Sequence, residues 1–376
     1  MNRAVSNVSG AAYKRIAKPI LFKTAPDTVH QRLVQSARIL QRARPLRGAM
    51  HTAWAYAGPS LRQRVAGITF DNPVGLSAGF DKNFELVPLI KSLGFGFMEG
   101  GSLTLEPCAG NPRPWFYRLP KTRSIVVYAG LANQGVERIV QRITNYPAGT
   151  FDHFPLNISV AKTNSPTAVT VQTAIADYTG SLAYLEGSGV GDMYTLNISC
   201  PNTYGGEPFT RPELLEALLA EVDELELSRP VFIKMPSHLD WPEFRELVDV
   251  AARHRIAGLT ISNLAKDRRT ASLADPLPDD IQGNLSGRPT WDLSNNLIRR
   301  TRLAYGERFV IIGVGGVFTA QDAYTKIRLG ANLVELITGL IYEGPALIGQ
   351  INAGLAALLR ADGLSNISEA VGVDAT

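Results

Sequence analysis

Residues 197–203, Asn-Ile-Ser-Cys-Pro-Asn-Thr, place carboxamides, hydroxyls and a thiol side by side. They follow the apolar run Met193–Leu196, which predicts a buried strand that ends in a loop. Because an amide group donates and accepts hydrogen bonds, Asn197 and Asn202 could together grip the edge of a planar amide or imide. Cys200 lies between them, and its thiolate could take a proton or attack carbon. The alternative is a turn shaped by Asn and Pro, with a small cysteine that fills space.

The composition is that of a soluble globular protein with one large domain and some additional chain. Of the 376 residues, 45% are hydrophobic and 19% are charged, and mean hydropathy is near zero. No stretch approaches the roughly 20 consecutive apolar residues that span a bilayer. The net charge of +4 is small, and no dense block of Lys and Arg carries interleaved aromatic residues. The composition therefore predicts neither an integral membrane protein nor a nucleic-acid-binding protein.

The two cysteines, Cys108 and Cys200, are too few for a cysteine metal cluster. The sequence contains neither an H-E-x-x-H motif nor paired C-x-x-C motifs, so we expect no metal site. Sparse cysteine fits a reducing cytoplasm, and no apolar secretory region follows Met1.

The N-terminal residues 11–47 are basic and helix-prone, unlike the chain that follows. Their apolar positions predict two short amphipathic helices with a break near residues 19–26. We expect residues 1–47 to form a segment that lies against an anionic membrane surface, peripherally on the inner face of the cell membrane. The alternative is a helical extension that packs on the main domain. The basic residues of this segment are Lys14, Arg15, Lys18, Lys23, Arg32, Arg38, Arg42, Arg44 and Arg47.

From residue 67 onward, short apolar runs alternate with helical patterns. Nine runs predict strands: Val74–Ala78, Phe97–Gly100, Ile125–Tyr128, Leu156–Val160, Tyr194–Ile198, Val231–Lys234, Gly258–Ser262, Phe309–Gly313 and Leu333–Ile337. The predicted helices include Phe84–Leu93, Pro212–Leu225, Trp241–His254, Leu293–Tyr305 and Ala320–Leu329. Such alternation over about 300 residues, without a G-x-G-x-x-G motif, predicts a (β/α)₈ TIM barrel that occupies residues 48–376.

Local signals mark some boundaries. Thr319 and Asp322 have the spacing of a helix N-cap, and Pro345 suits a first helical position. The chain turns polar after residue 361, which predicts a frayed tail.

In a TIM barrel, the active site lies at the carboxyl ends of the strands. Small-residue turns follow the last two predicted strands, at 313–316 and 338–339. Exposed backbone amides in such turns approach phosphate closely, so we expect a phosphorylated cofactor on that side of the barrel mouth. Each of these features could also be an ordinary turn or an ordinary surface lysine. The other polar strand ends are Ala78–Lys82, Gly100–Thr104, Asn157, Lys162, Asn197–Thr203, Lys234 and Ser262-Asn263.

Several motifs together resemble the class 2, membrane-associated dihydroorotate dehydrogenases. They cover nearly the whole chain in the family's order: residues 18–22 with Pro26, Asp27 and His30, then 75–82, 110–114, 197–203, 285–289, 313–316 and 344–345. The resemblance implies an FMN-containing barrel with an N-terminal helical pair that admits a quinone from the membrane. It also implies oxidation of a ring CH–CH bond, from dihydroorotate to orotate in pyrimidine synthesis.

The resemblance also implies roles for individual residues. Cys200 falls at the catalytic base, and Asn197, Asn202 and Asn263 fall at substrate-binding asparagines, with Lys82 beside them. Lys234 would place positive charge near the flavin N1 and C2 carbonyl. The expected FMN-binding positions are Ala78, Lys82, Ser102, Asn157, Asn197, Lys234, Ser262, Gly287, Gly315, Gly316, Thr338 and Gly339.

Several positions depart from the class 2 pattern, and three of them bear on the base and on substrate contacts. Cys200 stands where class 2 enzymes have serine; a free thiol, with a pKa of about 8.5, is nearer neutrality than a hydroxyl. Val127 and Leu264 stand where the family has polar contacts to the substrate. Each lost contact costs roughly 1–3 kcal/mol. One alternative is therefore a diverged flavoenzyme that acts on a less polar cyclic amide in a specialised pathway. Another is a non-catalytic flavin-binding protein.

Overall fold

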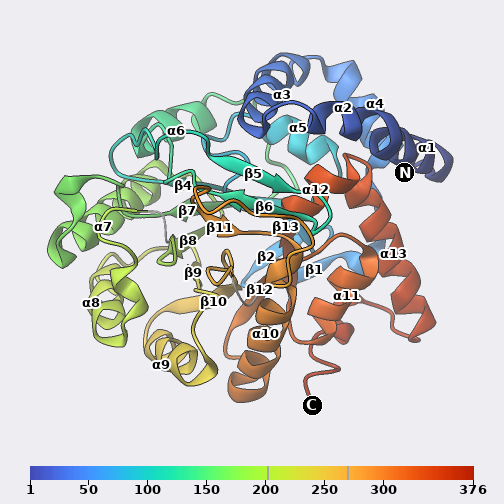
Figure 1. Ribbon diagram of the computed structural model, residues 1–376. Helices are drawn as coiled ribbons and strands as arrows, with labels where there is room; N and C mark the ends of the chain where they lie inside the picture. Colours follow the sequence, from blue (N-terminus) through green and yellow to red (C-terminus); the bar gives the residue numbers. More distant parts are fainter. Residues whose placement is uncertain (201–202, 269–270) are drawn as a thin grey trace.

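The computed structural model describes residues 1–200, 203–268 and 271–376, and its centre is a closed barrel of eight parallel strands (Figure 1). The strands follow the order β10-β12-β13-β3-β4-β7-β8-β9 around the barrel. The predicted TIM barrel is confirmed. The strands are β3 (Val74–Leu76), β4 (Phe97–Leu103), β7 (Leu156–Val160), β8 (Met193–Asn197), β9 (Val231–Lys234), β10 (Ile256–Ile261), β12 (Val310–Val314) and β13 (Leu333–Leu336).

The strands read as short apolar runs because parallel barrel strands are covered on both faces. Every residue of β3, β4, β7, β8, β9 and β13 is buried. A hairpin of β1 (Gln63–Val65) and β2 (Ile68–Phe70) packs against residues at the starts of barrel strands, including Phe97 and Leu333. This hairpin closes the amino end of the barrel, so the polar strand ends collect at the opposite, carboxyl end.

Helices separate the barrel strands, and several begin at side-chain caps. Asp240 makes a capping box with Glu243, and the Thr319 side chain accepts a hydrogen bond from the Asp322 amide at 3.1 Å, which confirms that predicted N-cap. The helices are α5 (Val87–Ser92), α6 (Val136–Thr144), α7 (Val171–Ser188), α8 (Pro212–Asp223), α9 (Trp241–Ala252), α10 (Trp291–Tyr305), α11 (Ala320–Arg328), α12 (Thr338–Glu343) and α13 (Leu347–Ala361).

The ninth predicted strand does not belong to the barrel. It is β6 (Ser124–Val127), which pairs antiparallel with β5 (Phe116–Leu119) and β11 (Asn284–Leu285). The short connection between β5 and β6 closes a hairpin, whereas parallel barrel neighbours need a longer crossover. This small sheet lies beside the barrel mouth and supports the N-terminal helices (Figure 1).

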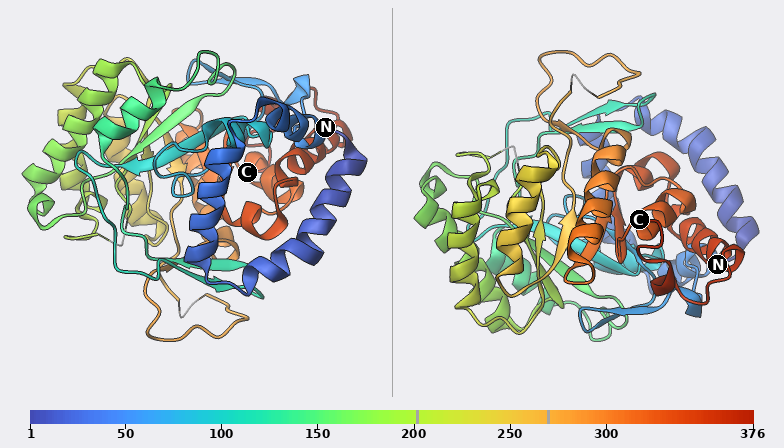
Figure 2. Two further views of the ribbon diagram at one scale, coloured as in Figure 1. Left: turned by 90° about the horizontal axis from the view of Figure 1, so that it is seen from above. Right: turned by 90° about the horizontal axis from the view of Figure 1, so that it is seen from below.

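Helices also form the N-terminal segment, and they begin earlier than predicted. A rod runs from α1 (Arg3–Ala12) through a π-helical turn (Tyr13–Ala17) into α2 (Lys18–Phe22). After a break at residues 23–25 come α3 (Pro26–Leu40) and α4 (Arg44–Trp54), so residue 47 lies inside α4. The rod and α3 form two arms of a V (Figure 2). Among the described residues, no helix is long and apolar enough to span a membrane.

Specific contacts hold the V against the barrel. The Asp27 carboxylate accepts hydrogen bonds from the Arg113 side chain at 2.7 Å and from the Trp115 amide at 3.0 Å. Arg118 donates to the Thr24 carbonyl at 2.7 Å, and the Tyr13 hydroxyl donates to the Ile341 carbonyl at 2.7 Å. The break between the arms is thereby fastened to β5, and the rod is fastened to α12.

Two local predictions were wrong in position. The helix predicted from Phe84 begins at Val87, because the Asp81 carboxylate instead accepts the amides of Glu85 and Leu86 at 2.8 and 2.7 Å. Pro345 precedes the N-cap Ala346 of α13 and is not its first residue.

The tail after residue 361 was predicted to fray and instead packs on the barrel. Ile367 and Ala370 are buried. The Arg328 side chain binds Asp374 at 2.7 Å and also pairs with Asp362. Contacts with α11, distant in sequence, fix these polar residues.

Candidate active site

A cavity at the carboxyl end of the barrel joins loops after β3, β9, β10, β12 and β13. Eight of the twelve predicted cofactor positions line it: Ala78, Lys234, Ser262, Gly287, Gly315, Gly316, Thr338 and Gly339. Leu264 and Asn263, predicted to contact the substrate, also line it. The barrel thus brings strand-end residues up to 261 positions apart to one cavity, as the sequence predicted.

The glycine turns of this cavity hold the backbone close to its neighbours. Gly315 and Gly316 have φ angles of +109° and +72°, which favour glycine. A β-carbon at Gly315 would lie 2.3 Å from the Thr290 Oγ1, and one at Gly339 would lie 2.1 Å from the Val317 carbonyl oxygen. Only glycine fits at these positions, and such turns present amides to an anion.

Ser102, Asn157 and Asn197 form a polar layer deeper in the barrel. The Asn197 Nδ2 donates to the Ser102 Oγ at 2.8 Å, and the Ser102 Oγ lies 2.7 Å from the Ser159 Oγ. The Asn157 Nδ2 and the Ser262 Oγ are buried without a hydrogen-bond partner among the described residues. Buried polar atoms are ordinarily satisfied, so these two fit a polar ring system such as a flavin.

A buried charge cluster surrounds Lys234. Its Nζ lies 3.5 Å from the Glu99 Oε2 and 3.3 Å from the Ser77 Oγ. Burial and the charge of Glu99 raise the pKa of Glu335 well above its ordinary value, although Lys234 opposes this. Glu335 therefore retains a proton more readily than an exposed carboxylate. Our sequence analysis missed both glutamates; the available signal was a carboxylate within an otherwise apolar strand.

The loop after β8 meets the ends of β9 and β10. The Asn263 Nδ2 donates to the Ser199 carbonyl at 2.7 Å, and the Ser199 Oγ donates to the Lys234 carbonyl at 2.8 Å. Cys200 follows and is partly exposed. Asn202, predicted to bind substrate, lies outside the described residues.

Lys162 lies near the Cys200 thiol, at the end of β7. Burial lowers the pKa of Lys162, and the charges of Cys200 and Asp177 oppose that shift. Its Nζ donates to the Tyr204 carbonyl. The sequence marked Lys162 as a strand-end residue but assigned it no role.

Lys82 lies in a neighbouring cavity of about 370 Å³ between the barrel and α3. Its Nζ donates to the Gly79 carbonyl at 2.7 Å and lies 5.5 Å from the centre of the Phe116 ring. Burial lowers the pKa of Lys82 to about 8. His30 shares this cavity, and its ring lies 5.8 Å from Phe80 and 5.5 Å from Phe116.

Val127 packs with the aromatic cluster of Phe318 and Tyr342, and it does not line the mouth cavity. Of the two aliphatic replacements, only Leu264 therefore changes the polarity of that cavity.

The family model for dihydroorotate dehydrogenase matches residues 60–359, which cover the barrel and its mouth. The chain belongs to the dihydroorotate dehydrogenase family.

Curated members of the dihydroorotate dehydrogenase family match over nearly their full length. "Dihydroorotate dehydrogenase (quinone)" of Haloarcula marismortui is 36% identical over 365 residues, covering 96% of this chain and 98% of the relative. The protein of the same name from Myxococcus xanthus is 35% identical over 364 residues, covering 96% and 97%. Coverage of 96% leaves about 15 residues unmatched, so the shared length includes α3 and α4.

Solved structures of the family have the same fold. The Eimeria tenella enzyme in complex with ferulenol matches with a TM-score of 0.81 and 26% identity, covering 93% of this chain and 95% of that one. Its ligand-free form matches with a TM-score of 0.79 and 27% identity, covering 90% and 98%.

Proposed function

We propose that this protein is an FMN-dependent dihydroorotate dehydrogenase that oxidises dihydroorotate to orotate in pyrimidine synthesis and uses a quinone as electron acceptor. The observation that carries this function is the match to quinone-type relatives over 96% of the chain, α3 and α4 included. The site agrees, because the polar strand ends meet at one mouth.

The residues around the mouth fit FMN. We assign the phosphate to the turns at Gly315-Gly316 and Thr338-Gly339, and the ring to Asn157, Lys234 and Ser262 with the other predicted positions. The mouth cavity measures about 100 Å³ and covers only part of the predicted cofactor site, because Ser102, Asn157 and Asn197 lie outside its lining. FMN held by these residues would supply a two-electron acceptor for the substrate hydride, to be reoxidised by the quinone.

The chain's own residues supply proton transfer and substrate recognition. Cys200 takes the substrate proton, and the Lys162 ammonium near it favours the thiolate. The Asn263 Nδ2 donates to the Asn197 Oδ1 at 3.4 Å and to the Ser199 carbonyl at 2.7 Å, so both amides are held in place to bind the dihydroorotate ring. We assign the same role to Asn202.

Dihydroorotate is the substrate that the relatives favour over a less polar cyclic amide. Of the two aliphatic replacements, Leu264 lines the mouth cavity, and Val127 packs against the cluster of Phe318 and Tyr342. Nothing in the site favours the non-catalytic alternative.

We assign quinone access and peripheral membrane contact to the N-terminal helices, as a unit of residues 1–47 on the barrel unit 48–376. The cavity beside Lys82 brings His30, Phe80 and Trp115 of the two units together. Burial lowers the pKa of His30 to about 4, so the imidazole is neutral at cytoplasmic pH. Exposed apolar side chains on these helices suit a membrane surface: Val8, Ile16, Ile20, Leu33 and Ile39.

The deciding experiment mixes the FMN-loaded protein with dihydroorotate under anaerobic conditions and follows the visible absorbance of the oxidised flavin. We expect rapid bleaching, followed by recovery when a quinone is added. Protein that dithionite bleaches but dihydroorotate does not would contradict the proposed substrate. Bleaching by dihydroorotate without recovery on adding quinone would contradict the proposed acceptor.

A further inference from the structure

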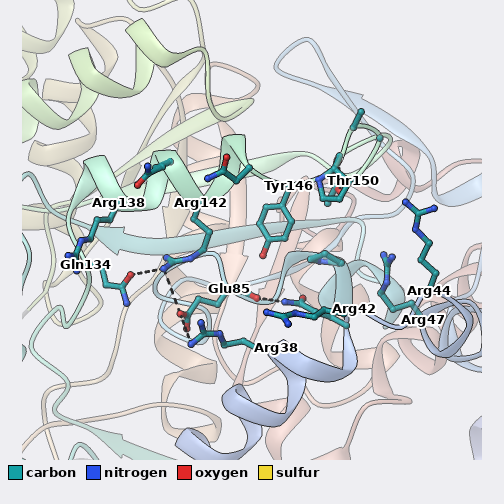
Figure 3. A pocket seen from close by; sticks show the side chains of 17 residues that line it. Arg38, Arg42, Arg44, Arg47, Glu85, Gln134, Arg138, Arg142, Tyr146 and Thr150 are labelled. Atoms are coloured by element: carbon teal, nitrogen blue, oxygen red, sulfur yellow. Dashed lines mark hydrogen bonds and ion pairs between the residues drawn. The ribbon is translucent and has the colours of Figure 1, made fainter.

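A large cavity of about 1,080 Å³ lies between the N-terminal helices and the barrel (Figure 3). One wall is formed by the end of α3 and the start of α4, and the other by α6 and the loop at 145–150. It shares no lining residue with the barrel mouth, and it borders the cavity beside Lys82 through Arg38, Glu85 and Gln134. This cavity is therefore separate from the barrel mouth.

The lining of this cavity is strongly basic. It contains six arginines, Arg38, Arg42, Arg44, Arg47, Arg138 and Arg142, against a single acidic residue, Glu85. Our sequence analysis assigned the four arginines of 38–47 to a membrane face. The structure instead gathers them opposite two arginines of α6, nearly a hundred residues away (Figure 3).

Glu85 neutralises only part of this positive charge. Its Oε1 lies 3.3 Å from the Arg38 Nη1 and 3.9 Å from the Arg142 Nη2. Arg142 also donates to the Asn83 carbonyl at 2.8 Å and to the Gln134 Oε1 at 2.7 Å. These contacts hold Arg142 on the wall of α6, and the ion pair with Glu85 links it to Arg38 on the opposite wall.

The other four arginines make no ion pair among the described residues. The Nε of Arg47 is buried without a hydrogen-bond partner there. Arg47 lies in the first turn of α4, whose N-cap Ala43 offers no capping side chain. A buried guanidinium nitrogen without an acceptor is costly, and several like charges around one cavity repel each other. An anion would remove both costs.

We propose that this cavity binds a multiply charged, phosphate-bearing anion. Guanidinium groups bind phosphate oxygens with paired hydrogen bonds, and arginines on opposite walls suit a ligand with more than one charge. The positive end of the α4 dipole adds to this field. The bound anion joins α3 and α4 to α6, so it stabilises the attachment of the N-terminal helices to the barrel.

Tripolyphosphate is the probe, and the protein is the full-length, FMN-loaded enzyme. We expect binding with one-to-one stoichiometry by calorimetry, and a Tm that rises with tripolyphosphate concentration. The variant Arg47→Gln/Arg138→Gln removes one charge from each wall and should weaken binding by about tenfold or more. The matched control, Arg64→Gln/Arg360→Gln, removes two exposed charges outside the cavity and the N-terminal helices and should bind like the wild type.

The source of the phosphate is tested by flotation with phosphatidylglycerol vesicles and with phosphatidylcholine vesicles. Tripolyphosphate binding that is lost only in the cavity variant assigns a soluble ligand. Flotation with phosphatidylglycerol that is lost only in that variant, without tripolyphosphate binding, assigns a lipid headgroup. Equal behaviour of the cavity and control variants, or binding of neither probe by the wild type, overturns the proposal. Arg42→Gln/Arg138→Gln repeats the test if Arg47→Gln does not fold, and flavin content verifies folding.

Discussion

In the proposed mechanism, the Sγ atom of Cys200 accepts the substrate proton. Its thiol needs less activation than a hydroxyl, and Lys162 supplies a nearby positive charge. Asn263 and Ser199 hold the backbone just before it, so the position of the base depends on hydrogen bonds and not on loop sequence alone. Substitutions of two single residues, Cys200 and Lys82, test the proposed site.

The first prediction concerns Cys200→Ala. Loss of the base should slow flavin reduction by dihydroorotate by about 10²–10⁴-fold, the usual contribution of general-base catalysis. Anaerobic stopped-flow absorbance measures it. Orotate binding and dithionite reduction serve as controls and should not change. Reduction at the wild-type rate would remove Cys200 from the mechanism.

The second prediction concerns Lys82, whose pKa burial lowers to about 8. The ammonium is charged below pH 8 and loses its charge as pH rises through 8. Since the resemblance places Lys82 at the substrate, the orotate anion should bind more weakly above that pH. We expect the dissociation constant to rise by up to about tenfold per pH unit above 8, as for one linked proton. Titration by the orotate-induced change in flavin absorbance measures it.

The variant Lys82→Arg is the control for this pH dependence. A guanidinium stays charged over the whole range, so its profile should be flat even if binding is weaker throughout. Parallel profiles for the two proteins would show that another group causes the dependence.

At the scale of elements, the N-terminal V is fastened at its vertex and along its rod. Asp27 binds β5, and Tyr13 binds α12. The helix α4 continues from residue 44 to 54 and packs against α5 and α13. A deletion that ends at residue 43 therefore removes both arms of the V and leaves α4 intact.

Deletion of residues 1–43 should separate the two half-reactions. Turnover with a quinone should fall by about tenfold or more, a loss of about 1.4 kcal/mol of transition-state stabilisation. Flavin reduction by dihydroorotate should persist, because the mouth residues all come from the barrel. Turnover with a soluble dye acceptor is the control. Equal loss with dye and quinone would contradict the assignment of quinone access to these helices.

At the scale of the whole molecule, the cofactor site joins the first and last parts of the barrel. Its lining runs from Ser77 after β3 to Gly339 after β13, and these two strands are neighbours in the closed sheet. A ligand bound there therefore contacts both ends of the chain segment that forms the barrel, and stabilises closure.

Removal of FMN should therefore lower the Tm. At an FMN concentration about 100 times its dissociation constant, binding contributes about 2.7 kcal/mol, which corresponds to about 3 °C for a chain of this length. Calorimetry of the FMN-free protein with added FMN measures the shift. Riboflavin, which lacks the phosphate, should give a smaller shift. Equal shifts would contradict the assignment of the glycine turns to phosphate.

The sequence by itself determined the barrel and much of its mouth. Buried parallel strands must be apolar on both faces, so the eight strands were visible as short apolar runs. Because parallel strands in a closed barrel end at one rim, residues as distant as Ala78 and Gly339 were predicted to meet, and both line the mouth cavity. The Thr319 N-cap was also predictable from the sequence, because it depends only on residues three positions apart.

Only the tertiary structure decided which distant segments pair. It placed residues 124–127 in a separate hairpin, turned Val127 away from the mouth and packed the tail on Arg328. It also buried Glu99 and Glu335 around Lys234, and gathered arginines of α3, α4 and α6 around one cavity. The pattern along a strand or helix sets which face is buried, whereas the partner of that face depends on contacts between segments far apart in sequence.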